Sequence, residues 1–217
     1  MNSDPFEEDA MTAALTFAAP ELPELLKRRD LTVDDVAHLP AEIHYELIDG
    51  RLALSPSALP LHNWIGQRVA AVCEVNQPPD VIIGTDQSVM IDFHNERRPD
   101  VVAIFEEGAG VSPVLASDVL FAFEIISPSS KSVDRKDKRR VYAASRISRY
   151  WVIDPLAERV SLTGFVLGPD GQYRQTVHTD EPLTIEEPWK ITLDLAAWTD
   201  RRDRLEQAVR DRQPDIR

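Results

Sequence analysis

Cysteine, histidine and long apolar runs are scarce in this 217-residue sequence, and each scarcity excludes a class of protein. The single cysteine, Cys73, cannot form an internal disulfide, and with five scattered histidines it gives no zinc-finger spacing. The longest apolar run, residues 119–123, is far shorter than the roughly 20 residues of a membrane-spanning helix. Residues 1–9 are acidic and lack the basic region of a secretory signal. We therefore expect a cytoplasmic protein with no membrane partner.

Basic residues are outnumbered, and they are unevenly distributed. The net charge is −13, a sign that opposes nonspecific binding to nucleic acid. Residues 1–60 hold four basic and twelve acidic residues, whereas residues 127–150 hold eight basic and two acidic residues. The basic segment is either a surface that contacts phosphates or a helix face exposed to solvent, and charge alone does not separate the two.

Hydrophobic residues make up 43% of the chain, enough for an ordinary core, and their spacing predicts a mixed arrangement of helices and strands. Thr32 and Asp35 approximate a capping box, and Asp49-Gly50 is a favoured hairpin turn. In chain order we predict a helix over 31–39, a hairpin over 45–54, a helix over 62–75, strands at 81–84, 87–92, 99–105 and 119–126, a helix over 134–146, a strand at 150–154, antiparallel strands across 158–195 and a helix over 199–209.

This order predicts an α/β core with a mixed central sheet flanked by helices, and an antiparallel hairpin before and after it. Residues 1–30 are expected to be a flexible acidic arm, residues 31–197 one domain, and residues 198–217 a charged helix and tail.

Two acidic residues stand at unusual places in the strands. Glu124 interrupts the apolar run 120–126, and Asp100 opens the apolar strand after Pro99. A buried carboxylate needs a basic side chain or a metal ion to balance it. If the two strands are neighbours, both carboxylates lie within reach of one ion, and such oxygen-rich sites suit Mg²⁺ or Mn²⁺. The alternative is a buried salt bridge or a solvated strand end.

Lys138 lies on the helix that follows. It shares a helical face with Val141, Tyr142 and Ser145, so we expect it to point toward the sheet, where it could reach a metal-bound water or a phosphate. The alternative is a lysine whose stem packs at the rim of the core.

Six motifs carry a resemblance to a known family. In order they are YELIDG at 45–50, SP at 55–56 followed by His62, RPDV at 98–101, EIISPS at 124–129, DRKDK at 134–138 and RYWVID at 149–154. Together they resemble the Uma-type restriction endonuclease family (domain of unknown function 820), a branch of the PD-(D/E)XK nuclease superfamily. The resemblance covers roughly residues 30–197 and implies a restriction-endonuclease-like core.

The superfamily pattern is Pro-Asp followed by acid-X-Lys on the adjacent strand. Asp100 and Glu124 match the acids, but Ile126 stands where the lysine is expected, and Lys138 on the next helix takes its place. Glu46 resembles the additional acid of the superfamily's N-terminal region, and His62 matches a recurrent histidine of the family. A helix cap or a histidine of the core is the alternative for His62.

The resemblance implies a metal-dependent endonuclease that forms a homodimer and cleaves DNA. Asp100 and Glu124 would bind Mg²⁺ with the carbonyl of Ile125, and Glu46 is a further candidate ligand. Lys138 would orient the attacking water or stabilise the phosphate oxygens. The residues predicted to contact nucleic acid are Lys131, Arg135, Lys136, Arg139 and Arg140.

Two other functions compete with this prediction. A scaffold protein that kept the nuclease fold without cutting would explain the net charge of −13, because binding to DNA phosphates usually needs a wider basic surface. A metal-dependent hydrolase of a small phosphorylated substrate would use the same residues.

Overall fold

The structure, a computed structural model, describes residues 19–55, 57–128 and 132–212; for residues 132–136 it describes the backbone alone. Contacts divide the chain into two units. The first comprises the described residues of Met1–Ser57 and Ser88–Arg98, and the second those of Ala58–Gln87 and Pro99–Arg217. No helix within the described ranges is long and apolar enough to cross a membrane.

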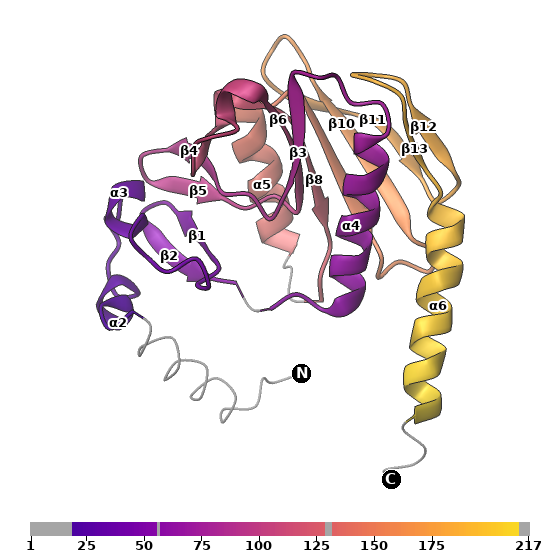
Figure 1. Ribbon diagram of the computed structural model, residues 1–217, viewed down its shortest axis with the longest axis horizontal. Helices are drawn as coiled ribbons and strands as arrows, with labels where there is room; N and C mark the ends of the chain where they lie inside the picture. The colour runs from indigo at the N-terminus through magenta and orange to yellow at the C-terminus, as the bar shows by residue number, and fades with distance from the viewer. Residues whose placement is uncertain (1–18, 56, 129–131, 213–217) are drawn as a thin grey trace. The chain divides into compact units, whose positions relative to one another are not determined.

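The first unit consists of two short helices and four strands (Figure 1). Its elements are α2 (Leu22–Leu25), α3 (Val33–Val36), β1 (Tyr45–Ile48), β2 (Arg51–Leu54), β4 (Val89–Asp92) and β5 (Asn95–Arg97). The strands pair antiparallel in the order β2-β1-β5-β4.

Local sequence signals explain two parts of this unit. Asp49 and Gly50 have φ values of 48° and 71°, as a two-residue hairpin turn between β1 and β2 requires. At the start of α3, the Thr32 side chain accepts a hydrogen bond from the Asp35 backbone, and the Asp35 carboxylate accepts one from the Thr32 backbone. The predicted hairpin and capping box are both confirmed.

The N-terminal segment corrects one expectation. Residues 1–30 were expected to form a flexible arm, but Ala19, Leu22 and Leu25 are buried in the core of the first unit together with Leu47. The described part of this segment therefore packs against the fold, and residues 1–18 lie outside the described residues.

The second unit is built on a six-stranded sheet (Figure 1). Its elements are α4 (Pro60–Glu74), β3 (Val81–Thr85), β6 (Val101–Phe105), β7 (Val114–Leu115), β8 (Val119–Ile125), α5 (Ser132–Ala144), β9 (Arg149–Asp154), β10 (Ser161–Leu167), β11 (Tyr173–Thr179), β12 (Leu183–Ile185), β13 (Ile191–Leu193) and α6 (Leu195–Arg212), with 3₁₀ turns at Glu106–Gly108 and Ala116–Asp118.

The strand order in the large sheet is β11-β10-β9-β8-β6-β3. Strands β8 and β9 are parallel, and all other neighbours in this sheet are antiparallel. The sheet is therefore mixed, as predicted. Strand β6, which Asp100 directly precedes, is the neighbour of β8, which carries Glu124.

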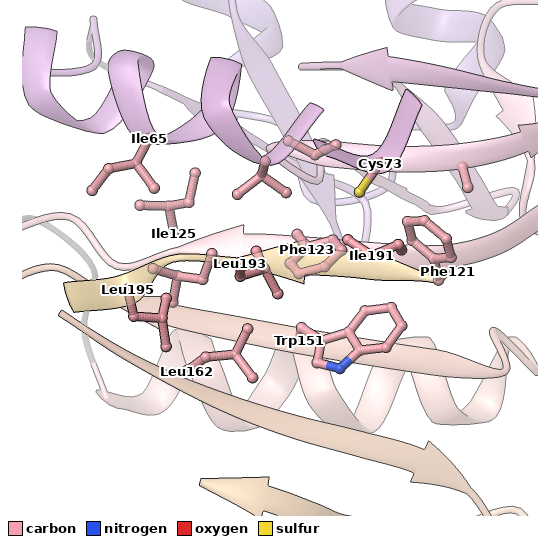
Figure 2. Close-up of a cluster of buried hydrophobic side chains, with 14 of the residues drawn as sticks. Ile65, Cys73, Phe121, Phe123, Ile125, Trp151, Leu162, Ile191, Leu193 and Leu195 are labelled. Carbon is pink, nitrogen blue, oxygen red and sulfur yellow. The ribbon is translucent and has the colours of Figure 1, made fainter. Parts of the chain in front are cut away.

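The two faces of β8 have different surroundings. Phe121, Phe123 and Ile125 belong to the main core cluster, and Figure 2 shows Ile65 and Cys73 of α4 pointing toward them. Burying each such apolar side chain contributes about 1.5–3 kcal/mol. Because side chains alternate along a strand, Glu124 faces the other side, toward α5.

The C-terminal helix also corrects an expected boundary. Residues 198–217 were expected to be a charged helix and tail outside the domain at 31–197, but α6 starts at Leu195, and Leu195 and Trp198 belong to the core of the second unit. The buried Arg202 guanidinium donates to the carbonyls of Pro155 and Ala157 at 2.8 and 2.7 Å. The first half of α6 is thus an integral part of the second unit.

Candidate active site

Asp100 and Glu124 lie at corresponding positions of two neighbouring strands of the second unit. Asp100 directly precedes β6, and Val101 of β6 pairs with Phe123 of β8. Continuing this antiparallel register by one residue sets Asp100 opposite Glu124. The two acids that the sequence singles out therefore lie together at one end of the sheet.

Asp100 is tied to the end of β8 by its carboxylate. The backbone N–H of Ile125 donates a hydrogen bond of 2.6 Å to Asp100 Oδ2. His62 Nε2 lies 3.4 Å from the same oxygen and 3.1 Å from the carbonyl oxygen of Ile125. His62, Asp100 and the backbone of Ile125 thus form one connected group.

His62 is placed by the first turn of α4, which begins at Pro60. The N-cap residue of this helix is Leu59, and no side chain caps it, so His62 is not a cap. The hydrogen bond to Asp100 raises the pKa of His62, and burial partly opposes this shift. The imidazole is therefore held beside two oxygen atoms that could bind a cation.

Glu124 is balanced by groups of α5. Its side chain is 12% exposed, and Lys138 Nζ lies 3.2 Å from Oε1 and 3.1 Å from Oε2. Lys138 is 13% exposed and faces the sheet, as its helical spacing predicts. A lysine ammonium beside a carboxylate removes much of the cost of burying either charge.

Tyr142 also belongs to this group, although no sequence motif indicates it. Its hydroxyl donates a hydrogen bond of 2.8 Å to Glu124 Oε1, and its side chain is fully buried. The signal that could have found it is its position four residues after Lys138, on the same helical face. Glu124 therefore has a charged and a neutral partner on one helix.

Glu46 belongs to the first unit, where it is buried on β1. Its Oε1 accepts a hydrogen bond of 3.1 Å from the backbone N–H of Arg98. Its participation in catalysis remains a prediction.

The residues predicted to contact nucleic acid are only partly described. Arg139 is exposed, with its guanidinium 5.2 Å from the centre of the Phe165 ring. The exposed Arg140 pairs with Asp137 at 2.7 Å. Arg135 and Lys136 lie in the first part of α5, residues 132–136, for which the structure describes the backbone alone. Lys131 lies outside the described residues.

The donor atoms of this group suit a hard cation. Carboxylates of Asp100 and Glu124 and the carbonyl of Ile125 are oxygen ligands, as Mg²⁺ and Mn²⁺ prefer. Within the described residues, no three or more histidine, cysteine, aspartate or glutamate side chains form a group that could hold a metal ion. Mg²⁺ fits this set because it needs only one or two protein carboxylates, with water and substrate phosphate completing its coordination.

The mixed sheet and its flanking helices have a restriction-endonuclease-like fold. The chain belongs to the Uma2 family, described as "Putative restriction endonuclease", whose family model matches residues 33–197. A crystal structure described as a putative nuclease belonging to DUF820 from Anabaena variabilis ATCC 29413 has the same fold, with a TM-score of 0.61 and 18% identity. The match covers 78% of this chain and 99% of that one. A search of curated proteins finds no match.

Proposed function

We propose that this protein is a metal-dependent endonuclease that hydrolyses phosphodiester bonds in DNA, with Mg²⁺ or Mn²⁺ as its ion. The observation that carries the proposal is the pairing of Asp100 with Glu124 at one end of the sheet, with Lys138 beside Glu124. Membership in a restriction endonuclease family supports the same chemistry. DNA as partner and a homodimer as the active form belong to this proposal.

Each residue of the group has a defined task in such a reaction. Asp100, Glu124 and the Ile125 carbonyl would hold the ion, which supplies a water of lowered pKa and neutralises charge on the phosphate. The Ile125 N–H and His62 keep the Asp100 carboxylate in one orientation. Lys138 has three N–H donors, so it can contact Glu124 and still donate to a water or a phosphate oxygen.

A scaffold protein without cleavage activity is the second candidate. Two observations favour it: the net charge of −13, and the fact that Lys138 and His62 already contact the two carboxylates. In that case the group is a buried salt-bridge network that stabilises the strand ends.

Melting temperature and cleavage together separate these candidates. An ion that binds only the folded protein stabilises it by about 2.7 kcal/mol at a concentration of 100 times Kd, so Mg²⁺ should raise the melting temperature. Asp100→Asn should abolish this rise, because the amide keeps the shape of the side chain and removes its charge. Asp200→Asn, at an exposed position on α6, is the matched control and should behave as wild type.

Cleavage is assayed on single- and double-stranded DNA and RNA with Mg²⁺, Mn²⁺ or a chelator. We expect wild-type protein to cleave DNA with either ion, and Asp100→Asn to be inactive. Lys138→Met should keep the metal-dependent rise in melting temperature but lose cleavage. Hydrolysis of small phosphate esters without nucleic-acid cleavage would indicate a small-molecule hydrolase. If millimolar Mg²⁺ and Mn²⁺ show no binding, even with nucleic acid present, the scaffold function replaces this proposal.

A further inference from the structure

Arg146 has a backbone conformation that arginine seldom adopts. Its φ is 64°, in the left-handed region that favours glycine. Two hydrogen bonds of 3.1 Å end α5 around it: the Ile147 N–H donates to the Tyr142 carbonyl, and the Arg146 N–H donates to the Ala143 carbonyl. This pattern is a Schellman motif, in which the left-handed position is usually glycine. The chain therefore holds an arginine where glycine would be less strained.

The end of the helix does not require this arginine. Ile147 and Tyr142 stand at the two positions whose apolar side chains commonly pack together in a Schellman motif, and they are 1% and 0% exposed. The Arg146 side chain is exposed and lies outside this core. A cation near the C-terminus of a helix is favourable, but it can stand in the last turn without strain, and α5 has no basic residue in its last turn. The strain at Arg146 therefore points to a function of its side chain.

The guanidinium of Arg146 lies beside the turn between β10 and β11. Gly171 of this turn has a φ of 75°, and its N–H donates to the Gly168 carbonyl at 2.9 Å. A Cβ on Gly171 would lie 3.7 Å from Arg146 Nη1. Asp170, the acid of the turn, is paired with Arg174 at 3.3 Å. Arg146 thus lies against a glycine backbone, next to an acid whose charge a second arginine balances.

Arg139 lies on the same side of α5 as Arg146. Its guanidinium is 5.2 Å from the centre of the Phe165 ring of β10, so both arginines lie beside β10 and the turn that follows it. Seven residues separate the two along the chain, which is about two helical turns or about 10 Å. One DNA strand carries a phosphate about every 3.4 Å along its axis, so this spacing spans about three phosphates. The two arginines are therefore spaced to contact one strand.

We propose that Arg146 contacts a phosphate of the DNA backbone and that, together with Arg139, it extends the basic surface of α5 for about two helical turns away from Lys138. This inference rests on the proposed function, because it takes DNA as the partner. It accounts for an arginine at a position that favours glycine: the side chain serves binding at the expense of stability.

Two substitutions at this position separate charge from backbone strain. Arg146→Gly and Arg146→Ala both remove the guanidinium, and only glycine removes the strain of the left-handed conformation. Both should weaken binding to a labelled DNA duplex and reduce the slope of log K against log salt concentration by about one, the loss of one phosphate contact. Arg146→Gly should melt about 2–4 °C above Arg146→Ala. Fluorescence anisotropy in a chelator gives the slope, and thermal unfolding gives the melting temperature.

Arg201→Ala is the matched control. It removes the same charge from an exposed position on α6, and its salt slope should equal that of wild type. Arg146→Lys retains the charge and should retain most of the slope. An equal loss of slope in Arg201→Ala would assign the effect to net charge and overturn the inference.

The remaining outcomes separate this inference from the proposed function. Wild-type protein that does not bind DNA would refute DNA as the partner, and with it the proposed function. Wild-type binding with an unaltered slope in both Arg146→Gly and Arg146→Ala would refute this inference alone. Such a result, combined with a lower melting temperature in Arg146→Gly than in wild type, would give Arg146 a structural role at the end of α5.

Discussion

Glu96 and Glu124 are both buried carboxylates on strands, yet their surroundings differ. Glu124 has the ammonium of Lys138 within 3.2 Å. Glu96, on β5 of the first unit, is 2% exposed and accepts a hydrogen bond from Ser88. Burial raises the pKa of Glu96 above its ordinary value of 4.5, and the Ser88 hydrogen bond and the charge of Arg98 only partly oppose this shift. Ionisation of Glu96 therefore destabilises the folded protein.

The sign of this shift predicts a pH dependence. The folded protein holds the Glu96 proton more tightly than the unfolded chain, so the contribution of Glu96 to stability is complete below about pH 4.5. It is lost as the pH rises through the higher pKa of the folded state. Glu96→Gln stays neutral, so it should raise the melting temperature at pH 7 and leave it nearly unchanged at pH 4.

Melting curves recorded from pH 4 to pH 8 in a chelator measure this effect. Glu42→Gln, at an exposed position of the same unit, is the control and should follow the wild-type curve. A Glu96→Gln variant that is less stable than wild type at pH 7 would show that the negative charge of Glu96 is favourable in the fold.

Single residues of the site were predictable where a helical repeat or an acid in an apolar strand marks them. Lys138 was placed toward the sheet because helical positions repeat with a fixed angle, and Asp100 and Glu124 were found because acids are unusual in apolar strands. The contact of Tyr142 with Glu124 joins residues 18 positions apart, and that of Asp100 with the Ile125 N–H joins residues 25 apart. Such contacts depend on how α5 and β6 pack against β8, which local patterns do not contain.

At the scale of elements, the short helix α2 shows that a segment of only four residues can contribute to a hydrophobic core. It has four residues, too few to be stable alone, since a helix of fewer than about twelve residues is marginal in water. Leu22 and Leu25 are 2% and 7% exposed and pack in the cluster of the first unit. The packing of these leucines, and not helix propensity, holds the segment in place.

Leu22→Ala should therefore lower the free energy of unfolding. Truncation of a buried leucine costs about 2–5 kcal/mol, the lost transfer energy plus the cavity left behind. Denaturant unfolding followed by circular dichroism measures the difference. Lys27→Ala removes an ion pair between side chains that are 70% and 76% exposed, and it should change stability by less than about 1 kcal/mol. A Leu22→Ala variant as stable as this control would show that α2 does not contribute to the core.

Elements with strong local signals were predictable, and those without were not. The predicted helix at 62–75 and strand at 119–126 match α4 and β8 closely, because their apolar residues follow one period. Strand β5 was missed: its residues are Asn95, Glu96 and Arg97, which read as a loop although Glu96 and Arg97 are buried. Tertiary packing overrides local preference at such positions.

At the scale of the whole molecule, the negative net charge must be reconciled with the proposed binding to DNA, which is itself negatively charged. A net charge of −13 repels a polyanion, so binding to DNA requires a local basic surface. The exposed Arg139 and Arg140 lie on α5, the helix that also carries Lys138. Arg139 rests over the Phe165 ring, and Arg140 pairs with Asp137 on the surface, a pair that costs little to separate.

Replacing Arg139 and Arg140 together by glutamate should weaken DNA binding and lower its dependence on salt. Each phosphate contact contributes about 0.9 to the slope of log K against log salt concentration, so the loss of two contacts should reduce the slope by about two. Binding measured by fluorescence anisotropy at several salt concentrations gives this slope. Wild-type and variant proteins are compared in a chelator, so that metal-dependent cleavage does not interfere.

The net charge of the protein also changes in this variant, and a control must separate that effect from lost contacts. Replacing Arg201 and Arg204 by glutamate makes the same change at exposed positions of α6. A general repulsion would weaken binding equally in both double variants, whereas phosphate contacts on α5 affect the first alone. An unchanged salt slope in the α5 variant would assign that face to solvent. Because α5 also positions Lys138 and Tyr142 at Glu124, a reduced slope would mean that one helix both contacts the nucleic-acid backbone and completes the active site.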